Sequence, residues 1–342
     1  MKLLTTSAMA LALLANSAAA EGELVLYHWF EYIPAELLEK FTAETGITVT
    51  MDTYDSNEAM LASLKAGGIG TYDLAVPTDY MVSIMIGEGL LDPINEGKLA
   101  NKGNISPEWA DPSFDPGRMH SVPYQWGSTS FAVDTDVYKG DINTTDILFN
   151  PPAALSGKIN MIDSQGEVLA LASVHMGIPQ CTNDREQLQA LNDMLQNAKQ
   201  HWASFNSDTA KEVLVSGDVT VGMIFDGFSA KAREERASIT YAFPTQGYLV
   251  WMDSIVLLKD APNRDNAIVF MDFMLEPENI AAVSNFARYG LGVSGAEEYL
   301  DPALSTLPEA NPPATAGEGV FVIPCDQETQ AVYDQIWTNL KN

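Results

Sequence analysis

The segment from residue 24 to residue 80 alternates between strand-like and helix-like patterns, and this alternation limits the possible folds more than any other feature of the chain. Apolar or β-branched runs predict the strands, and apolar residues at helical spacing, closed by nearby glycines, predict the helices between them. A β-α-β-α-β order favours an α/β fold with a mainly parallel sheet. The predicted elements lie in turn at residues 24–30, 34–45, 47–53, 57–65 and 72–76.

A second set of strands and helices follows, and two long extended segments separate it from the first set. About 320 residues remain after a predicted N-terminal leader, which is more than one small core usually organises. We therefore expect two lobes, each a mainly parallel sheet flanked by helices, with a ligand cleft between them and a hinge of several strands. The second set lies at 159–162, 168–175, 185–201 and 220–225, the crossing segments at 124–133 and 248–258, and later helices at 264–275, 277–287 and 328–340.

The lobes are predicted to be discontinuous in sequence because the chain leaves and re-enters each of them. We expect lobe 1 to contain residues 21–130 with 255–303, and lobe 2 to contain residues 131–254 with 304–342. The stretch from 302 to 319 is rich in proline, glycine and alanine and is interpreted as a linker.

Residues 1–20 have the pattern of a secretory signal peptide. A lysine near the start, an apolar run at 8–14 and three alanines at 18–20 match a leader that is cleaved after a small-x-small site. The apolar run is shorter than the roughly 20 residues that a membrane-spanning helix needs. We therefore expect an exported protein that resides in the periplasm.

Two cysteines, Cys181 and Cys325, are present. An oxidising compartment favours a disulfide between them, which would join the C-terminal segment to the middle of the chain. Two unpaired thiols remain the alternative.

The chain is strongly acidic, with 46 Asp and Glu against 18 Lys and Arg. This balance repels nucleic acid and anionic membrane surfaces, so we expect neither as a partner. It attracts cationic solutes, but it also serves solubility in a salty medium and therefore identifies no ligand.

Enzyme motifs are absent from the sequence. It has no P-loop and no G-x-S-x-G elbow, and its histidines lack the spacing of a zinc site. Residues 290–295 match G-x-G-x-x-G but follow a helical pattern instead of a strand, which predicts a turn-rich loop. We expect no enzymatic activity, no metal and no cofactor. The histidines are His28, His120, His175 and His201.

Aromatic and acidic residues gather where predicted strands end. The carboxyl ends of parallel strands face the ligand crevice of open α/β folds, and aromatic faces with carboxylates suit an organic cation. Singly, such an aromatic is more often the edge of a core, and an acid at a helix start complements the helix dipole. The candidate binding residues are Trp29, Glu31, Tyr32, Thr78, Tyr80, Glu167, Phe225, Asp226, Trp251, Asp253 and Tyr289.

Several motifs extend this pattern through nearly the whole chain after the leader. They are WFEYIP at 29–34, YDSNE at 54–58, YDLAVPT at 72–78, SVPYQWG at 121–127, FNS at 205–207, GMI at 222–224 and WMDS at 251–254. With these motifs the chain resembles the periplasmic spermidine/putrescine-binding proteins of ABC importers. The resemblance implies a two-lobed periplasmic binding protein fold, ligand capture by lobe closure, and delivery of the ligand to a permease in the inner membrane.

The resemblance also implies roles for individual residues. Glu167 and Asp253 would hold ammonium groups, and Thr78 would offer a hydroxyl. Tyr289 matches a tyrosine of the family. An aromatic box around a methylene chain would consist of Trp29, Tyr32, Tyr80 and Trp251.

The chain departs from the family at three positions. Ser164 stands where spermidine-type members have an acid, and Phe225 stands where tryptophan is usual. Because each desolvated ammonium needs a partner, the loss of one acid favours a diamine such as putrescine over spermidine. Asp226 has no counterpart in the family, so it is either a replacement acid in the crevice or a turn residue bonded to backbone amides.

Other interpretations remain open. The same fold accommodates other organic cations, amino-acid derivatives or Fe³⁺, although Trp29 and Trp251 cannot ligate a metal. An exported glycosidase would use paired carboxylates, but a sugar site rarely needs so many acids without bases. In each case we expect a monomer.

Overall fold

The computed structural model describes residues 22–94 and 98–342. The predicted signal peptide, residues 1–20, lies outside the described residues. Among the residues that are described, no helix is long and apolar enough to cross a membrane.

One continuous sheet runs through the molecule, in the strand order β2-β1-β3-β9-β4-β7-β5-β6, with β10 and β8 paired to β4 and β11 paired to β9. The strands are β1 (Gly22–Trp29), β2 (Ile47–Tyr54), β3 (Leu74–Ala75), β4 (Ser121–Asp134), β5 (Ile159–Met161), β6 (Trp202–Phe205), β7 (Val221–Phe225), β8 (Ile239–Ala242), β9 (Tyr248–Leu257), β10 (Gly290–Leu291) and β11 (Gly319–Phe321).

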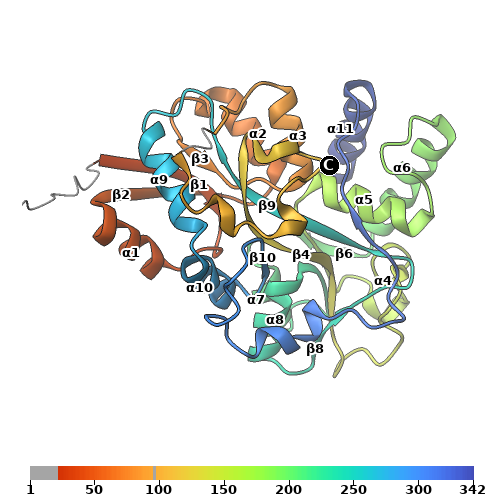
Figure 1. Ribbon diagram of the computed structural model, residues 1–342. Helices are drawn as coiled ribbons and strands as arrows, with labels where there is room; N and C mark the ends of the chain where they lie inside the picture. The colour runs from red at the N-terminus through yellow and green to blue at the C-terminus, as the bar shows by residue number, and fades with distance from the viewer. Residues whose placement is uncertain (1–21, 95–97) are drawn as a thin grey trace, which may run out of the picture.

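Helices cover the sheet on both sides (Figure 1). They are α1 (Ala35–Thr45), α2 (Asn57–Ser63), α3 (Asp79–Gly87), α4 (Asp146–Phe149), α5 (Gln165–Met176), α6 (Arg185–Lys199), α7 (Ala210–Ser216), α8 (Asp226–Glu235), α9 (Arg264–Met274), α10 (Pro277–Ala287) and α11 (Gln327–Lys341).

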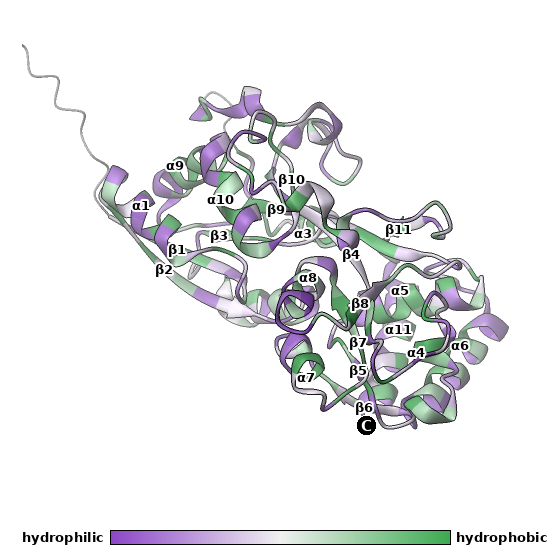
Figure 2. Ribbon diagram, turned by 90° about the horizontal axis from the view of Figure 1, so that it is seen from below, coloured by the Kyte–Doolittle hydropathy of each residue, from purple (hydrophilic) through white to green (hydrophobic). Residues whose placement is uncertain are grey.

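The long antiparallel pair β4 and β9 joins two groups of elements. Strand β3 pairs with β9 on one side, and β7 pairs with β4 on the other. Figure 2 shows β1, β2, β3, α1, α9 and α10 on one side of this pair and β5, β6, β7, α5, α6 and α11 on the other. We call these groups the first and the second lobe. Residues at the middle of β4 and β9 therefore lie where both lobes meet.

Local sequence explains how the first lobe forms. Strand β1 is parallel to β2 and β3, and its residues Leu24 and Leu26 are fully buried. The phenyl ring of Phe41 on α1 packs at 5.1 Å against that of Phe270 on α9. Helix α1 ends at Gly46, whose φ of 75° is left-handed and costs glycine little.

Most predicted elements are present within a few residues of their expected bounds, but two segments differ from the prediction. Residues Gly290 and Leu291, predicted as loop, form β10, which pairs antiparallel with Trp126 and Gln125 of β4. The linker predicted over 302–319 leads directly into β11, which adds a parallel strand to β9. In both segments the strand is defined by a partner far away in sequence, so local pattern does not indicate it.

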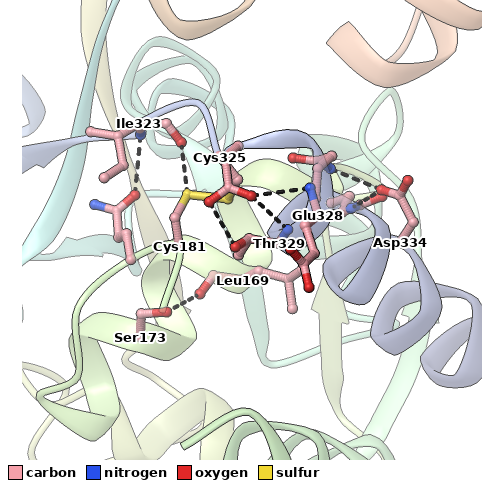
Figure 3. The surroundings of a disulfide bond; sticks show 12 residues. Leu169, Ser173, Cys181, Ile323, Cys325, Glu328, Thr329 and Asp334 are labelled. Atoms are coloured by element: carbon pink, nitrogen blue, oxygen red, sulfur yellow. Dashed lines mark hydrogen bonds between the residues drawn. A yellow bond between two sulfur atoms is a disulfide. The ribbon is translucent and has the colours of Figure 1, made fainter. Parts of the chain in front are cut away.

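Cys181 and Cys325 form a disulfide, which confirms the predicted pairing (Figure 3). The amide side chain of Gln180 strengthens the attachment, because it donates to the carbonyl of Phe321 at 2.9 Å and accepts from the backbone amide of Ile323 at 3.3 Å. The disulfide fastens the segment between β11 and α11 to the loop after α5. Helix α11 then lies beside α5 and α6 (Figure 1).

Candidate functional site

A cavity lies where strand ends from both lobes meet. Its described lining includes four carboxylates and no lysine, arginine or histidine. Most of the lining residues lie at or just after the carboxyl end of a strand or at the start of the following helix. The lining residues are Trp29, Phe30, Tyr32, Asp55, Thr78, Glu167, Ser207, Asp208, Phe225, Phe228, Trp251, Asp253 and Tyr289.

Asp253 of β9 is buried at the first-lobe side of the cavity, with 4% of its surface exposed. Its Oδ1 accepts a hydrogen bond of 2.8 Å from the hydroxyl of Thr78, which precedes α3. Burial raises the pKa of Asp253 well above its ordinary value, and the charges of Asp79 and Glu167 raise it further. The hydroxyl of Tyr32 is buried near this carboxylate but has no partner at ordinary hydrogen-bond geometry. Within the described lining, this end of the cavity therefore has a carboxylate and no cation to pair with it.

Glu167 occupies the first turn of α5 on the second-lobe side. Its Oε1 accepts a 2.6 Å hydrogen bond from the hydroxyl of Thr129 on β4. The same hydroxyl oxygen accepts a 3.0 Å hydrogen bond from the indole nitrogen of Trp251 on β9. Burial raises the pKa of Glu167 to about 7, although the hydrogen bonds from Thr129 and Ser164 oppose this shift. The two joining strands thus hold Glu167 next to an aromatic wall.

Aromatic rings from both lobes line the cavity between the two acids. The indole of Trp29 donates to the carbonyl of Val76 at 2.7 Å, which fixes the ring at the end of β1. Trp251 packs edge-on against Tyr289 at 5.2 Å and against Phe225 at 6.2 Å between ring centroids. Such walls suit an apolar or cationic chain that extends from one carboxylate to the other.

Comparison with known proteins identifies the family of this chain. A family model described as bacterial extracellular solute-binding protein matches residues 36–312. The chain belongs to this family. The spermidine/putrescine-binding periplasmic protein of Salmonella typhimurium is 33% identical over 341 residues, which cover 99% of this chain and 97% of the relative. A putrescine-binding periplasmic protein of Pseudomonas aeruginosa is 29% identical over 343 residues, covering 95% and 93%.

Solved structures share the fold of this solute-binding protein. A Listeria monocytogenes protein, provisionally described as a spermidine/putrescine ABC transporter, has a TM-score of 0.87 and 31% identity, covering 93% of this chain and 98% of its own. A spermidine/putrescine ABC transporter substrate-binding protein of Streptococcus pneumoniae has a TM-score of 0.74 and 30% identity, covering 94% and 99%. These likenesses confirm the predicted two-lobed periplasmic binding protein fold.

Some residues predicted for the site of the solute-binding protein lie outside the cavity lining. Glu31 is exposed in a left-handed conformation with φ of 49°. Ser164 is the residue before α5, and its hydroxyl lowers the pKa of Glu167. Tyr80 is buried and lines a neighbouring cavity instead, where its hydroxyl donates to Glu58 at 3.0 Å.

Asp226 also lies outside the lining, at the first position of α8. Its carboxylate accepts hydrogen bonds from the hydroxyl of Ser128 at 3.2 Å and from the backbone amide of Gly227 at 3.0 Å. A Cβ placed on Gly127 would lie 2.6 Å from Asp226 Oδ1 and 2.8 Å from the ring of Trp251, so the carboxylate lies close to this wall of the cavity. Burial raises the pKa of Asp226 to about 8.

The sequence interpretation did not select five of the lining residues, which are Phe30, Asp55, Ser207, Asp208 and Phe228. Strand ends could have indicated four of them, because Phe30 and Asp55 directly follow β1 and β2, and Ser207 and Asp208 lie two and three residues after β6. Partial burial raises the pKa of Asp208, and the charge of Asp55, which lines the same cavity, raises it further. Phe228 lies inside helix α8 and gives no comparable signal.

Proposed function

We propose that this protein is the periplasmic substrate-binding component of a polyamine ABC transporter and that it captures putrescine or a similar diamine. The observation that carries this proposal is the pair of buried carboxylates, Asp253 and Glu167, in a cavity whose described lining has no basic side chain. An unpaired buried charge costs several kcal/mol, so a dication that pairs with both acids offsets a large unfavourable energy. The names of the relatives support the same ligand class.

The proposed binding mode assigns one ammonium group to each acid. One ammonium donates to Asp253 and Tyr32, and the other donates to Glu167, as charge-assisted hydrogen bonds. The methylenes lie against Trp29 and Trp251, where each cation–π contact with a terminal ammonium contributes about 0.5 to 2 kcal/mol.

Capture follows from closure of the lobes about β4 and β9. We propose residues 21–130 with 255–303 as one rigid unit and residues 131–254 with 304–342 as the other. The closed form then docks on the permease in the inner membrane. The relatives are named as binding proteins, and we propose binding without catalysis for this chain as well.

Spermidine is the second candidate ligand. Ser164 adds no charge beside Glu167, which favours a diamine. Asp55 and Asp208, however, place further carboxylates in the lining, where a longer amine would reach them. Because both side chains are exposed, solvent screens their attraction, and we rank putrescine first.

Fe³⁺ is disfavoured as the ligand because burial raises the pKa of Tyr32 and Tyr289 well above the ordinary value, so neither readily becomes a phenolate ligand. Within residues 22–94 and 98–342, no group of three or more His, Cys, Asp or Glu side chains is arranged to hold a metal ion.

Isothermal titration calorimetry of the mature protein with putrescine, spermidine, an amino acid and a neutral sugar tests the proposal. We expect a micromolar or lower Kd for putrescine, a higher Kd for spermidine, and no heat from the sugar. Titrations at low and high salt distinguish binding in the cavity from general attraction to the acidic surface. Salt strongly screens exposed charges, so it should weaken surface binding more than binding to the buried acids. Heat from the sugar but from no amine would overturn the ligand class, whereas a preference for spermidine would overturn only the inference from Ser164.

A further inference from the structure

Helix α2 begins with two polar residues that link to different lobes. The side-chain amide of Asn57 donates to the hydroxyl of Thr78 at 2.9 Å, and its carbonyl accepts from the backbone amide of Thr78 at 3.2 Å. The Thr78 hydroxyl in turn donates to Asp253. Asn57 is therefore one hydroxyl away from Asp253 on the joining strand β9.

Glu58, the next residue, reaches across to the second lobe. Its Oε1 accepts a 3.1 Å hydrogen bond from the backbone amide of Gly166 in the first turn of α5. That amide has no partner within its own helix, and the N-terminus of a helix carries a partial positive charge that attracts a carboxylate. Gly166 directly precedes Glu167, so Glu58 holds the backbone beside the acid of the second lobe.

The fit around this contact is close. A Cβ on Gly166 would lie 3.0 Å from Glu58 Oε1 and 3.0 Å from the hydroxyl of Tyr80, so a residue larger than glycine would require these two side chains to shift. Tyr80 is 5% exposed, and its hydroxyl donates to the same oxygen of Glu58. The contact therefore exists only when α2, α3 and α5 lie together.

We propose that Glu58 is a positioning residue for ligand capture, a latch that holds α5 and its Glu167 against the first lobe when the lobes are closed. This inference rests on the proposed function. Without a cation, the charges of Glu58, Glu167 and Asp253 repel one another and oppose closure. A bound dication neutralises Glu167 and Asp253, which leaves Glu58 free to accept from Gly166. The latch thus links closure to the charge of the ligand and disfavours closure on a neutral solute.

The test compares the wild type with Glu58→Ala, Glu58→Gln and Gly166→Ala. Glu36→Ala is the matched control, because Glu36 is an exposed acid in the first turn of α1. The putrescine dissociation rate is measured by stopped-flow tryptophan fluorescence, and closure is measured as the radius of gyration by X-ray scattering at saturating putrescine. Thermal unfolding of each ligand-free variant reports whether it folds.

We expect Glu58→Ala to dissociate about 10 to 100 times faster and to give a larger radius of gyration with ligand, as loss of a charge-assisted hydrogen bond implies. Gly166→Ala, which displaces the Glu58 and Tyr80 side chains without removing the bond, should change both quantities less and in the same direction. Glu58→Gln retains an acceptor oxygen and should recover most of the slow dissociation, and Glu36→Ala should match the wild type.

A purely structural role of Glu58 would lower the unfolding temperature without changing closure. Absence of putrescine binding by the wild type overturns the proposed function and with it the latch, whereas wild-type binding with an unchanged dissociation rate in Glu58→Ala overturns the latch alone.

Discussion

Two buried carboxylates of this solute-binding protein destabilise its ligand-free form and favour the binding of a cation. Asp253 and Glu167 are each less than a tenth exposed, and each accepts a hydrogen bond from a threonine hydroxyl instead of a basic group. A hydroxyl compensates a buried charge only in part. The ligand-free protein therefore carries an energetic cost at these residues that a cation removes.

Replacement of Asp253 by asparagine should separate binding from stability. The asparagine side chain would keep an oxygen for the Thr78 hydroxyl but would carry no charge to desolvate. We expect Asp253→Asn to raise the free energy of unfolding of the ligand-free protein at pH 8 by about 1 kcal/mol or more. Its putrescine Kd should rise at least about 100-fold, as loss of a buried ion pair implies. Urea denaturation and calorimetry measure the two effects.

Asp226→Asn is the control for this prediction. It also removes a buried charge near Trp251, but from a carboxylate that bonds to Ser128 and Gly227 outside the cavity lining. We expect its putrescine Kd to stay within about threefold of the wild type. Equal losses of affinity in both variants would instead assign Asp226 to the ligand. Trp251→Ala is a poorer test, because Trp251 is 7% exposed and its loss would also leave a cavity in the core.

At the scale of elements, the C-terminal segment acts as a strap over the second lobe. Strand β11 pairs with β9, the disulfide follows, and α11 then buries Tyr333, Ile336 and Leu340. The side chain of Asp326 caps α11 by accepting from the backbone amides of Glu328 and Thr329. Noncovalent contacts and one covalent bond therefore hold the same segment.

Replacement of both Cys181 and Cys325 by serine should destabilise the protein without changing its ligand affinity. The disulfide closes a loop with a sequence separation of 144, for which loop entropy predicts a loss of up to about 5 kcal/mol. The putrescine Kd should stay within about threefold, because neither cysteine lines the ligand cavity. Calorimetric unfolding and a binding titration check both statements. An unchanged unfolding temperature would mean that the contacts of β11 and α11 hold the C-terminal segment in place without the disulfide.

At the scale of the whole molecule, buried acids make stability depend on pH in an unusual direction. The pKa of Glu167 rises from 4.5 to about 7 on folding, and that of Asp226 rises from 3.8 to about 8. Between these values the unfolded chain has released the proton while the folded chain retains it. The free energy of unfolding therefore falls as pH rises through this window.

We expect the ligand-free protein to be less stable at pH 8 than at pH 5, with Glu167 alone contributing a decrease on the order of 3 kcal/mol. The net charge of −28 adds self-repulsion in the same direction. Saturating putrescine should remove much of this decrease, because the cation stabilises the ionised carboxylates. Urea denaturation at both pH values, with and without ligand, measures it. Stability that is constant or rises from pH 5 to pH 8 would contradict the burial of these acids.

The sequence by itself determined the α/β class, most helices and strands, and much of the cavity lining. Residues such as Trp29, Thr78 and Phe225 were identifiable because strand ends follow from local pattern, and the carboxyl ends of parallel strands share one edge of a sheet. The disulfide was predictable because two cysteines in an oxidising compartment leave a single pairing.

Only the tertiary structure decided which way a side chain points at the start of a helix. Tyr80, Ser164 and Asp226 all stand near strand ends, yet all three lie outside the cavity lining, and Tyr80 and Asp226 bond to protein groups there. Glu58 contacts Gly166, more than one hundred positions along the chain. The direction of such a side chain depends on which partner the fold places within hydrogen-bond distance. A local sequence pattern cannot predict partners that are so distant in sequence.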